Sequence, residues 1–420
     1  MNELEVLDDT YFQKDRDTKI NEKYASILEM VERDHAAHGK LLDFDSLGDD
    51  KKKESEYLGL KSKAMDFMPE HQVAAKEGLE KAVELDPENS EATRDLGVAF
   101  YKLRDYDKSI SLYTKALELN KDDKKLLGYL SMAMRSAPTK SDDQKLENLN
   151  KGIEFAKVAV NLDINDSHSW YLLGNSYMTS FFATEKYDDL DKSLKAYMQA
   201  EKLQKYPNPD LYNNRATIFT YFERYSEAIR DYMRANTIDP GLNASDKAEQ
   251  ICSFVIGTTR MIEQKKSAKN KKIQDMVKTI PKKVGEVKFL STKENDQTLK
   301  YKLQDQSELN AGENLGVIFC GKVICQIHKS PDVPACFLCI DSKSNFTVLS
   351  LYNINKGIKD KINYGDEILI RDPTLIFISI EYESRLLTYP CIKVINLSDI
   401  LVNEQTLADV YSRVEAVSAN

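Results

Sequence analysis

Small apolar residues recur along the first half of the chain at a spacing that indicates a repeated structural unit. Similar segments occupy residues 82–87 and 235–240, which read Ala-Val-Glu-Leu-Asp-Pro and Ala-Asn-Thr-Ile-Asp-Pro. The alanines at positions 82, 116, 159, 200 and 235 are separated by 34, 43, 41 and 35 residues. This series predicts a helical unit of about 34 residues that repeats along the chain and has received two insertions.

A second set of positions identifies the type of repeat. Trp170, Leu173, Gly174 and Tyr177 follow the W-x2-L-G-x2-Y signature of the tetratricopeptide repeat, which is a pair of antiparallel helices. Small residues let neighbouring helices approach closely, and aromatic residues fill the gaps between them. Because one helical hairpin cannot bury its apolar face alone, several must stack. We therefore predict a tetratricopeptide-repeat superhelix.

The predicted array has defined limits. It occupies residues 56–245, after an N-terminal helical segment at 1–55, and the insertions at 136–143 and 180–187 are expected to extend turns. A capping helix and a basic junction follow at 246–285.

The pattern changes to short β-rich runs from about residue 286. These runs occupy 316–328, 337–340, 346–352, 367–370, 375–380 and 391–395. Gly321 interrupts the first run, as a glycine does where a strand bends round the corner of a barrel. Residues 355–361 fit the short helix of an OB barrel. We predict an OB-fold domain over 286–405 and a tail at 406–420, with a different small barrel as the alternative. The predicted fold class is α+β and multidomain.

Composition and charge narrow the function. The chain carries 59 Lys+Arg against 68 Asp+Glu, a net charge of −9, which excludes a nucleic-acid binder that uses its whole surface. No apolar run reaches the roughly 20 residues of a membrane-spanning helix, so no membrane partner is expected. The acidic start lacks the features of a secretory signal, and we expect six reduced cysteines in an intracellular protein.

The sequence contains few features that are typical of a catalytic site or a metal site. Cys336 and Cys339, like Cys320 and Cys325, lie within β-runs at odd spacing, so each pair should point to opposite faces of the sheet. Buried strand cysteines are therefore favoured over zinc ligands. The chain has no Gly-rich phosphate loop, G-x-S-x-G elbow or H-E-x-x-H helix. We predict a protein without enzymatic activity or cofactor.

The repeat array offers a binding site instead. In this architecture the first helix of each hairpin lines a groove, and charged and polar side chains there suit an extended charged peptide. Counting from the repeat anchors places the following residues in the groove: Arg94, Tyr101, Lys102, Arg135, His168, Tyr171, Asn175, Asp210, Asn213 and Thr217. For any one of these positions, the alternative is an ordinary solvated residue on a scaffold.

A basic stretch marks the junction between the two predicted domains. Nine Lys/Arg residues against Glu263 and Asp275 give residues 260–283 a local charge of +7. Its densest part contains Lys265, Lys266, Lys269, Lys271 and Lys272. Such a run could contact RNA phosphates, and the alternatives are a solvated linker or a nuclear-localisation patch. From residue 286 onward 14 Lys/Arg face 18 Asp/Glu, which favours a protein-binding barrel over a nucleic-acid-binding one.

Several stretches resemble the Strap family, also called tetratricopeptide repeat protein five. They are residues 130–135, 169–177, 208–211 with 214–216, 269–272, and 321–323 with 351–353. The resemblance covers roughly residues 56 to 400. It implies a cytosolic adaptor that recognises the nascent Met-Arg-Glu terminus of tubulins on translating ribosomes. The family then promotes decay of the tubulin mRNA through an adaptor and a deadenylase.

The resemblance assigns roles to residues that match its motifs. Arg135 would meet the peptide glutamate and Asp210 the peptide arginine, while Lys269 and Lys271 would contact the ribosome, its rRNA and a tunnel-exit protein. A further family acid is missing at 241–244, and Asp246 is a candidate replacement.

Two other functions remain open at this point. The family also suggests a nuclear stress-responsive cofactor that scaffolds an acetyltransferase with a transcription factor. The fold alone allows a co-chaperone-like groove, although the regular clamp for C-terminal carboxylates is absent.

Overall fold

The computed structural model describes residues 51–66, 72–267, 270–282, 301–328, 334–352 and 362–407. The predicted N-terminal helix before residue 51 and the predicted OB helix at 355–361 lie outside these ranges. The chain divides into two compact units. Unit 1 runs to Arg215 and includes Arg234–Leu242, and unit 2 contains Ala216–Met233 and the chain from Asn243 onward.

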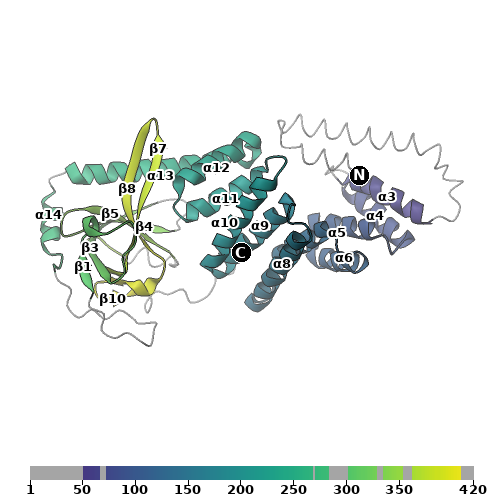
Figure 1. The fold of residues 1–420 in the computed structure, drawn as a ribbon, viewed down its shortest axis with the longest axis horizontal. Helices are drawn as coiled ribbons and strands as arrows, with labels where there is room; N and C mark the ends of the chain where they lie inside the picture. Colours follow the sequence, from purple (N-terminus) through teal and green to yellow (C-terminus); the bar gives the residue numbers. More distant parts are fainter. Residues whose placement is uncertain are drawn as a thin grey trace. The chain divides into compact units, whose positions relative to one another are not determined.

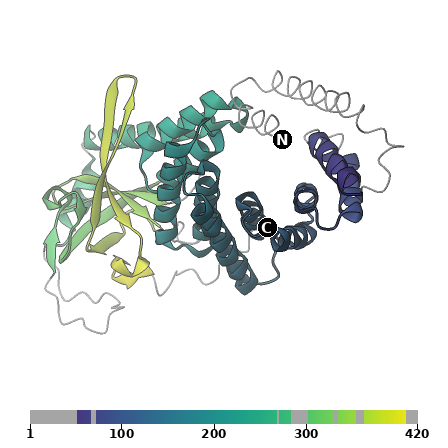
Figure 2. The same cartoon turned by 45° about the vertical axis from the view of Figure 1, so that its right-hand side comes forward.

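Ten helices form successive antiparallel pairs, as the repeat spacing predicts (Figure 1). They are α3 (Lys51–Met65), α4 (Gln72–Leu85), α5 (Ser90–Lys102), α6 (Tyr106–Leu119), α7 (Lys124–Ser136), α8 (Asp142–Leu162), α9 (Ser167–Thr184), α10 (Tyr187–Leu203), α11 (Pro209–Tyr221) and α12 (Tyr225–Ile238). Figure 2 shows the helices up to α10 side by side in chain order. Asn89, Asp105, Asp123 and Asp166 cap the starts of α5, α6, α7 and α9 with side-chain hydrogen bonds.

Glycine and tyrosine fit together inside the hairpins. A Cβ atom on Gly97 would lie 2.6 Å from the Tyr113 ring, and one on Gly174 would lie 2.6 Å from the Tyr197 ring. Both tyrosines are fully buried. The repeat signature therefore has a steric cause, because the absence of a side chain on the first helix makes room for a ring on the second.

One of the two insertions differs from the expectation. Within the first insertion, residues 137–141 connect α7 to α8, but α9 continues through Ser180 to Thr184, so most of the second insertion is helix rather than turn. Two interactions hold it in this form: Phe181 is buried, and the Ser180 hydroxyl donates a hydrogen bond of 2.7 Å to Asp189.

The C-terminal part of unit 2 is a curled sheet of ten strands. They are β1 (Lys302–Gln304), β2 (Gly312–Glu313), β3 (Val317–Ile327), β4 (Ala335–Ile340), β5 (Phe346–Leu351), β6 (Glu367–Arg371), β7 (Thr374–Tyr382), β8 (Arg385–Val394), β9 (Ile400–Val402) and β10 (Gln405–Thr406). Their order is β10-β9-β6-β3-β4-β5-β8-β7-β2, with β1 beside β3, and β5 pairs with β8 in parallel. The six predicted β-runs correspond to β3–β8.

The long strand β3 bends where the sequence predicts it. It pairs with β6 over Ile318–Lys322 and with β4 over Lys322–Ile327, so it changes partner beside Gly321. A Cβ atom at Gly321 would lie 3.0 Å from the Ile340 carbonyl oxygen, which explains why a glycine is needed there. The apolar side chains that gather inside the sheet include Phe319, Phe337 and Ile392.

Helix α13 (Ala244–Ser267) contacts β7 and β8 (Figure 1), and α14 (Lys271–Lys278) follows it. Ile273 and Ile280 are buried and anchor the α14 segment. Among the described residues, no helix is long and apolar enough to span a membrane.

Candidate functional site

The predicted groove residues lie on the first helices of successive hairpins. We use the term A-helix face for the side of α5, α7, α9 and α11 that carries Arg94, Tyr101, Arg135, Tyr171, Asn175 and Asp210. Tyr171 on α9 lies near two opposite charges, Arg135 on α7 and Asp210 on α11. The pKa of Tyr171 is raised to about 12, first by burial and then by Asp210, while Asn175 and Arg135 act in the opposite direction. Tyr171 therefore lies within electrostatic range of both charges.

Arg135 is a partly buried cation in the last turn of α7. Its Nη1 donates a hydrogen bond of 3.2 Å to the Thr179 hydroxyl, while its Nε is buried and has no hydrogen-bond partner. Among the described residues no carboxylate forms an ion pair with it.

Burial lowers the pKa of Arg135. Three phenols act in the opposite direction, those of Tyr197, Tyr101 and Tyr171. Guanidinium groups nevertheless stay protonated in proteins, so this position keeps a positive charge with an unused donor. A buried donor without a partner costs free energy that a ligand acceptor can restore.

Asp210 is a partly buried anion in the first turn of α11. Its pKa is raised by burial and then by the charge of Asp239. The start of a helix favours a carboxylate, and the Asn208 side chain also accepts hydrogen bonds from the first backbone N–H groups, at 3.0 Å from Asp210. Within the described ranges no cation forms an ion pair with the Asp210 carboxylate.

Asn175 connects the two charges through a polar network. Its side-chain oxygen accepts hydrogen bonds from the Tyr197 hydroxyl at 2.5 Å and from the Asn214 amide at 3.1 Å. Its backbone carbonyl accepts a hydrogen bond of 2.8 Å from Thr179, the residue that holds Arg135. These bonds fix the amide of Asn175, so its oxygen is occupied and only its N–H groups remain as donors.

The predicted residues on α5 are already paired within the protein. The Arg94 guanidinium lies 3.0 Å from Asp95 and 3.3 Å from Asp123, and its side chain is only 8% exposed. Burial alone would lower the pKa of Arg94, but these two acids raise it above its ordinary value. Lys102 lies 2.6 Å from Asp66, and the Tyr101 hydroxyl is 2.9 Å from that of Ser136. We therefore assign Arg94 and Lys102 to the stability of the array.

The remaining predicted groove residues make contacts with neutral polar or aromatic groups. His168 is exposed, with its ring 6.1 Å from that of Tyr171. The Asn213 amide contacts the Asn214 side chain at 3.4 Å, and in unit 2 the hydroxyls of Thr217 and Tyr232 are 3.2 Å apart.

The lysines of the basic junction lie at the ends of two helices. Lys265 and Lys266 occupy the last turn of α13, where the helix dipole favours cations. Lys271 and Lys272 occupy the first positions of α14, where the dipole disfavours them, and both are exposed. None of the four forms an ion pair within the described part of the chain, and Lys269 lies outside it. Because the helix dipole disfavours Lys271 and Lys272 at the start of α14, their presence there suggests an anionic partner.

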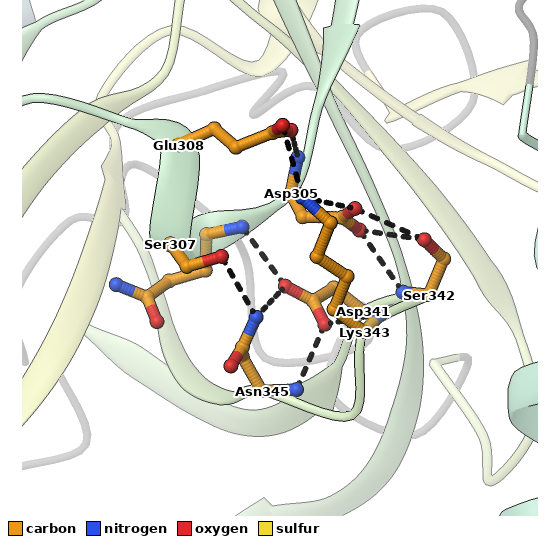
Figure 3. Close-up of polar contacts among 8 residues, drawn as sticks. Asp305, Ser307, Glu308, Asp341, Ser342, Lys343 and Asn345 are labelled. Carbon is orange, nitrogen blue, oxygen red and sulfur yellow. Dashed lines mark hydrogen bonds and ion pairs between the residues drawn. The ribbon is translucent and has the colours of Figure 1, made fainter.

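A separate acidic cluster in unit 2 has a structural role (Figure 3). The Asp341 carboxylate accepts hydrogen bonds from the backbone N–H groups of Gln306, Lys343 and Asn345. Asp305 accepts hydrogen bonds from Ser342. This network ties the β4–β5 turn to the segment after β1. No group of three metal-ligating side chains occurs in the described ranges.

Four residues of the site were not predicted from the sequence. Tyr197, Thr179 and Asn214 orient Asn175 and Arg135, but only Tyr197 had a recognisable signal, the aromatic position opposite Gly174. Asp239 is the fourth, because its charge acts on Asp210 although it belongs to the segment after α12.

Taken together, the A-helix face offers a cation on α7 and an anion on α11, with amide and phenol groups of α9 between them. Such an arrangement can bind an extended peptide that carries an anion and a cation in neighbouring positions. The residues that define this face include no nucleophile–base pair.

Comparison with models of known protein families agrees with this architecture. The model of the "Tetratricopeptide repeat protein 5 OB fold domain" matches residues 300–414, and two tetratricopeptide-repeat models match residues 74–124 and 209–242. None of these is a catalytic family. A solved thermophilic TPR protein of Thermus thermophilus is 17% identical and covers 48% of this chain and 98% of that chain, with a TM-score of 0.40.

Curated relatives match most of the chain. Human tetratricopeptide repeat protein 5 is 31% identical over 374 residues, which is 86% of this chain and 84% of the human protein. The mouse protein of the same name is 32% identical over 349 residues, which is 81% of this chain and 78% of the mouse protein. With repeats, an OB-fold domain and this degree of identity, the chain is a tetratricopeptide-repeat adaptor that belongs to the tetratricopeptide repeat protein 5 family.

Proposed function

We propose that this protein recognises the nascent Met-Arg-Glu terminus of tubulins on translating ribosomes and triggers decay of their mRNA. The observation that carries the proposal is the unsatisfied pair of charges on the A-helix face. Arg135 has a buried Nε without a partner, and Asp210 has a raised pKa and no cation beside it among the described residues. Each charge lacks the partner that such a peptide would supply.

The order of the charges favours one direction of the peptide. The peptide arginine, at its second position, would pair with Asp210 on α11. The glutamate at its third position would pair with Arg135 on α7, where the free Nε offers a donor for a charge-assisted hydrogen bond. Tyr171 and the amide of Asn175 would lie beneath the peptide backbone between these two positions.

The basic junction supports the part of the proposal that concerns binding to the ribosome. Lys265, Lys266, Lys271 and Lys272, together with Lys269, would contact ribosomal RNA near the exit of the nascent chain. Each phosphate contact adds affinity that falls with salt concentration. The recruited partner would be an adaptor that links the complex to a deadenylase.

Peptide binding provides the decisive test. Arg135→Ala and Asp210→Ala should each weaken binding of a Met-Arg-Glu-Ile peptide by about 2–5 kcal/mol, or roughly thirtyfold or more in Kd. A Met-Glu-Arg-Ile peptide, in which the two charges are exchanged, should fail on the unmodified protein. Lys108→Ala is the matched control, because Lys108 is exposed and, among the described residues, forms an ion pair with Asp105 alone.

The same variants can be tested on ribosomes by photocrosslinking to a nascent tubulin chain. Both groove variants should lose the crosslink and retain their folded circular dichroism spectrum. Normal capture by both would remove the tubulin proposal and leave the nuclear cofactor function as the better explanation. Lys269→Glu with Lys271→Glu should abolish ribosome co-sedimentation while binding of the free peptide persists.

A further inference from the structure

The turn between α11 and α12 places a carboxylate inside unit 2. Glu223 is only 5% exposed and has a left-handed φ of 59°. A left-handed backbone is uncommon for a residue other than glycine and costs on the order of 1 kcal/mol. Arg104 and Glu185 have the same left-handed φ at the turns of two earlier hairpins, at 61° and 58°, so the backbone conformation belongs to the repeat turn and the burial distinguishes Glu223.

Side chains of two neighbouring strands surround the carboxylate. The Ser350 hydroxyl on β5 donates a hydrogen bond of 2.6 Å to Oε1, and the Tyr352 hydroxyl donates one of 2.9 Å to Oε2. The Lys393 ammonium on β8 lies 3.8 Å from Oε2 and is 11% exposed. Burial first, and then Glu223, raise the pKa of the neighbouring Cys391 thiol.

The same strand residues also satisfy the end of α11. Lys393 donates a hydrogen bond of 3.2 Å to the Phe222 carbonyl. The Tyr352 hydroxyl lies 2.9 Å from both the Tyr221 carbonyl oxygen and Glu223 Oε2, so these two acceptors share its single hydrogen. The last carbonyl groups of a helix lack partners within the helix, and a cation is favourable there. The sheet therefore supplies the C-terminal cap of a repeat helix.

These contacts make the turn and the strands dependent on each other. A buried carboxylate without partners costs several kcal/mol, and so does a buried ammonium. If the turn left the sheet, Lys393 would lose both its ion pair with Glu223 and its hydrogen bond to the Phe222 carbonyl. If β5 or β8 frayed, Glu223 and the α11 carbonyls would lose their donors.

We propose that Glu223 is a conformational lock that makes the α11–α12 turn open only together with β5 and β8. The inner part of the last helical hairpin, Ala216–Met233, then belongs to the folding unit of the sheet, although its sequence is that of a repeat. The lock also fixes the far end of α11, the helix that begins beside Asp210. The proposal does not depend on which peptide the protein recognises.

Hydrogen exchange on the full-length protein, followed by mass spectrometry, tests the lock. Glu223→Gln should speed exchange by roughly a hundredfold in residues 216–233, 346–352 and 385–394 together, because it leaves Lys393 uncompensated. Helices α5–α8 should exchange at the unchanged rate. Glu227→Gln is the matched control, since Glu227 lies at the same turn and pairs with Arg224 at the surface.

Two further variants keep the test decisive if Glu223→Gln fails to fold. Tyr352→Phe removes one hydroxyl from the cluster and should accelerate the same three segments to a smaller extent. Adding Lys393→Met to Glu223→Gln should restore part of the protection, because it removes the unpaired cation. Faster exchange confined to residues 216–233 would overturn the proposal. So would additive losses of protection from Glu223→Gln and Lys393→Met in the double variant.

Discussion

The first helical hairpins and the later ones carry charged residues on the same A-helix face, but they differ in how these charges are satisfied. On α5, Arg94 lies within 3.3 Å of two acids and Lys102 lies 2.6 Å from Asp66. On α7 and α11, Arg135 and Asp210 have no ion-pair partner among the described residues. Since an unpaired charge is costly to bury, a protein retains one where a ligand completes it. The difference separates the part of the face that stabilises the array from the part that we expect to bind.

The largest effect should come from breaking a pair on α5. Arg94→Met removes the cation beside Asp123 and leaves Asp95 with its longer contact to Lys63 at 3.6 Å, and we expect the free energy of unfolding to fall by about 3 kcal/mol. Urea denaturation, followed by circular dichroism, measures this loss. Peptide affinity below the unfolding range should remain unchanged, and a large loss of affinity would place Arg94 in the binding part instead.

Acidification should weaken peptide binding through Asp210. Burial raises the pKa of this carboxyl above 3.8 in the free protein, and a bound cation favours its charged form. Binding is therefore complete above this raised pKa and decreases as the pH falls through it, by at most about tenfold per pH unit. A Met-Arg-Gln-Ile peptide isolates the effect, because it lacks the titrating glutamate.

The control for this titration is Asp210→Asn. This variant should bind the same peptide more weakly and show no pH dependence over the range in which the protein stays folded. An identical pH profile in the variant would show that another carboxyl group, such as Asp239, carries the effect.

Removing the unpaired cation of α7 should not lower the free energy of unfolding, in contrast to removing the paired cation of α5. Arg135→Met takes a buried charge with an unsatisfied Nε out of the array, so the free energy of unfolding should stay constant or rise by about 1 kcal/mol. The denaturation midpoint of the free protein measures it. A loss as large as that of Arg94→Met would mean that Arg135 has a structural partner.

The smallest effect on stability should come from α14, which, within the described part of the chain, also carries both unpaired and paired cations. Lys271 and Lys272 oppose the helix dipole, whereas Lys278 pairs with Asp275 at 2.8 Å in the last turn. Lys271→Ala with Lys272→Ala should leave stability unchanged or raise it by about 0.5 kcal/mol, and Lys278→Ala should lower it by a similar amount. Polyanion binding, measured at two salt concentrations, should fall more for the first pair of substitutions.

The sequence predicted the repeat array, the six principal strands and the bend at Gly321, because these features depend on local patterns. Counting along the repeat also predicts that Arg135 and Asp210 lie on one face. It did not reveal β1, β2, β9 and β10, which have two or three residues each and carry too few alternating positions to be recognised. The second insertion was misjudged because the burial of Phe181 extends α9.

The amino-acid sequence by itself determined the repeated helices and the six principal strands, and it predicts which side chains share a face. Spacing of small and aromatic residues is enough for this, since it acts over one or two turns or one strand. Only the tertiary structure decided which charges are satisfied. Arg94 meets Asp123 at a separation of 29 residues, Lys102 meets Asp66 at 36, and Tyr352 meets Glu223 at 129. Pairing and burial are properties of the folded neighbourhood, and for that reason the chain pattern could not distinguish Arg94 from Arg135 or show the role of Glu223.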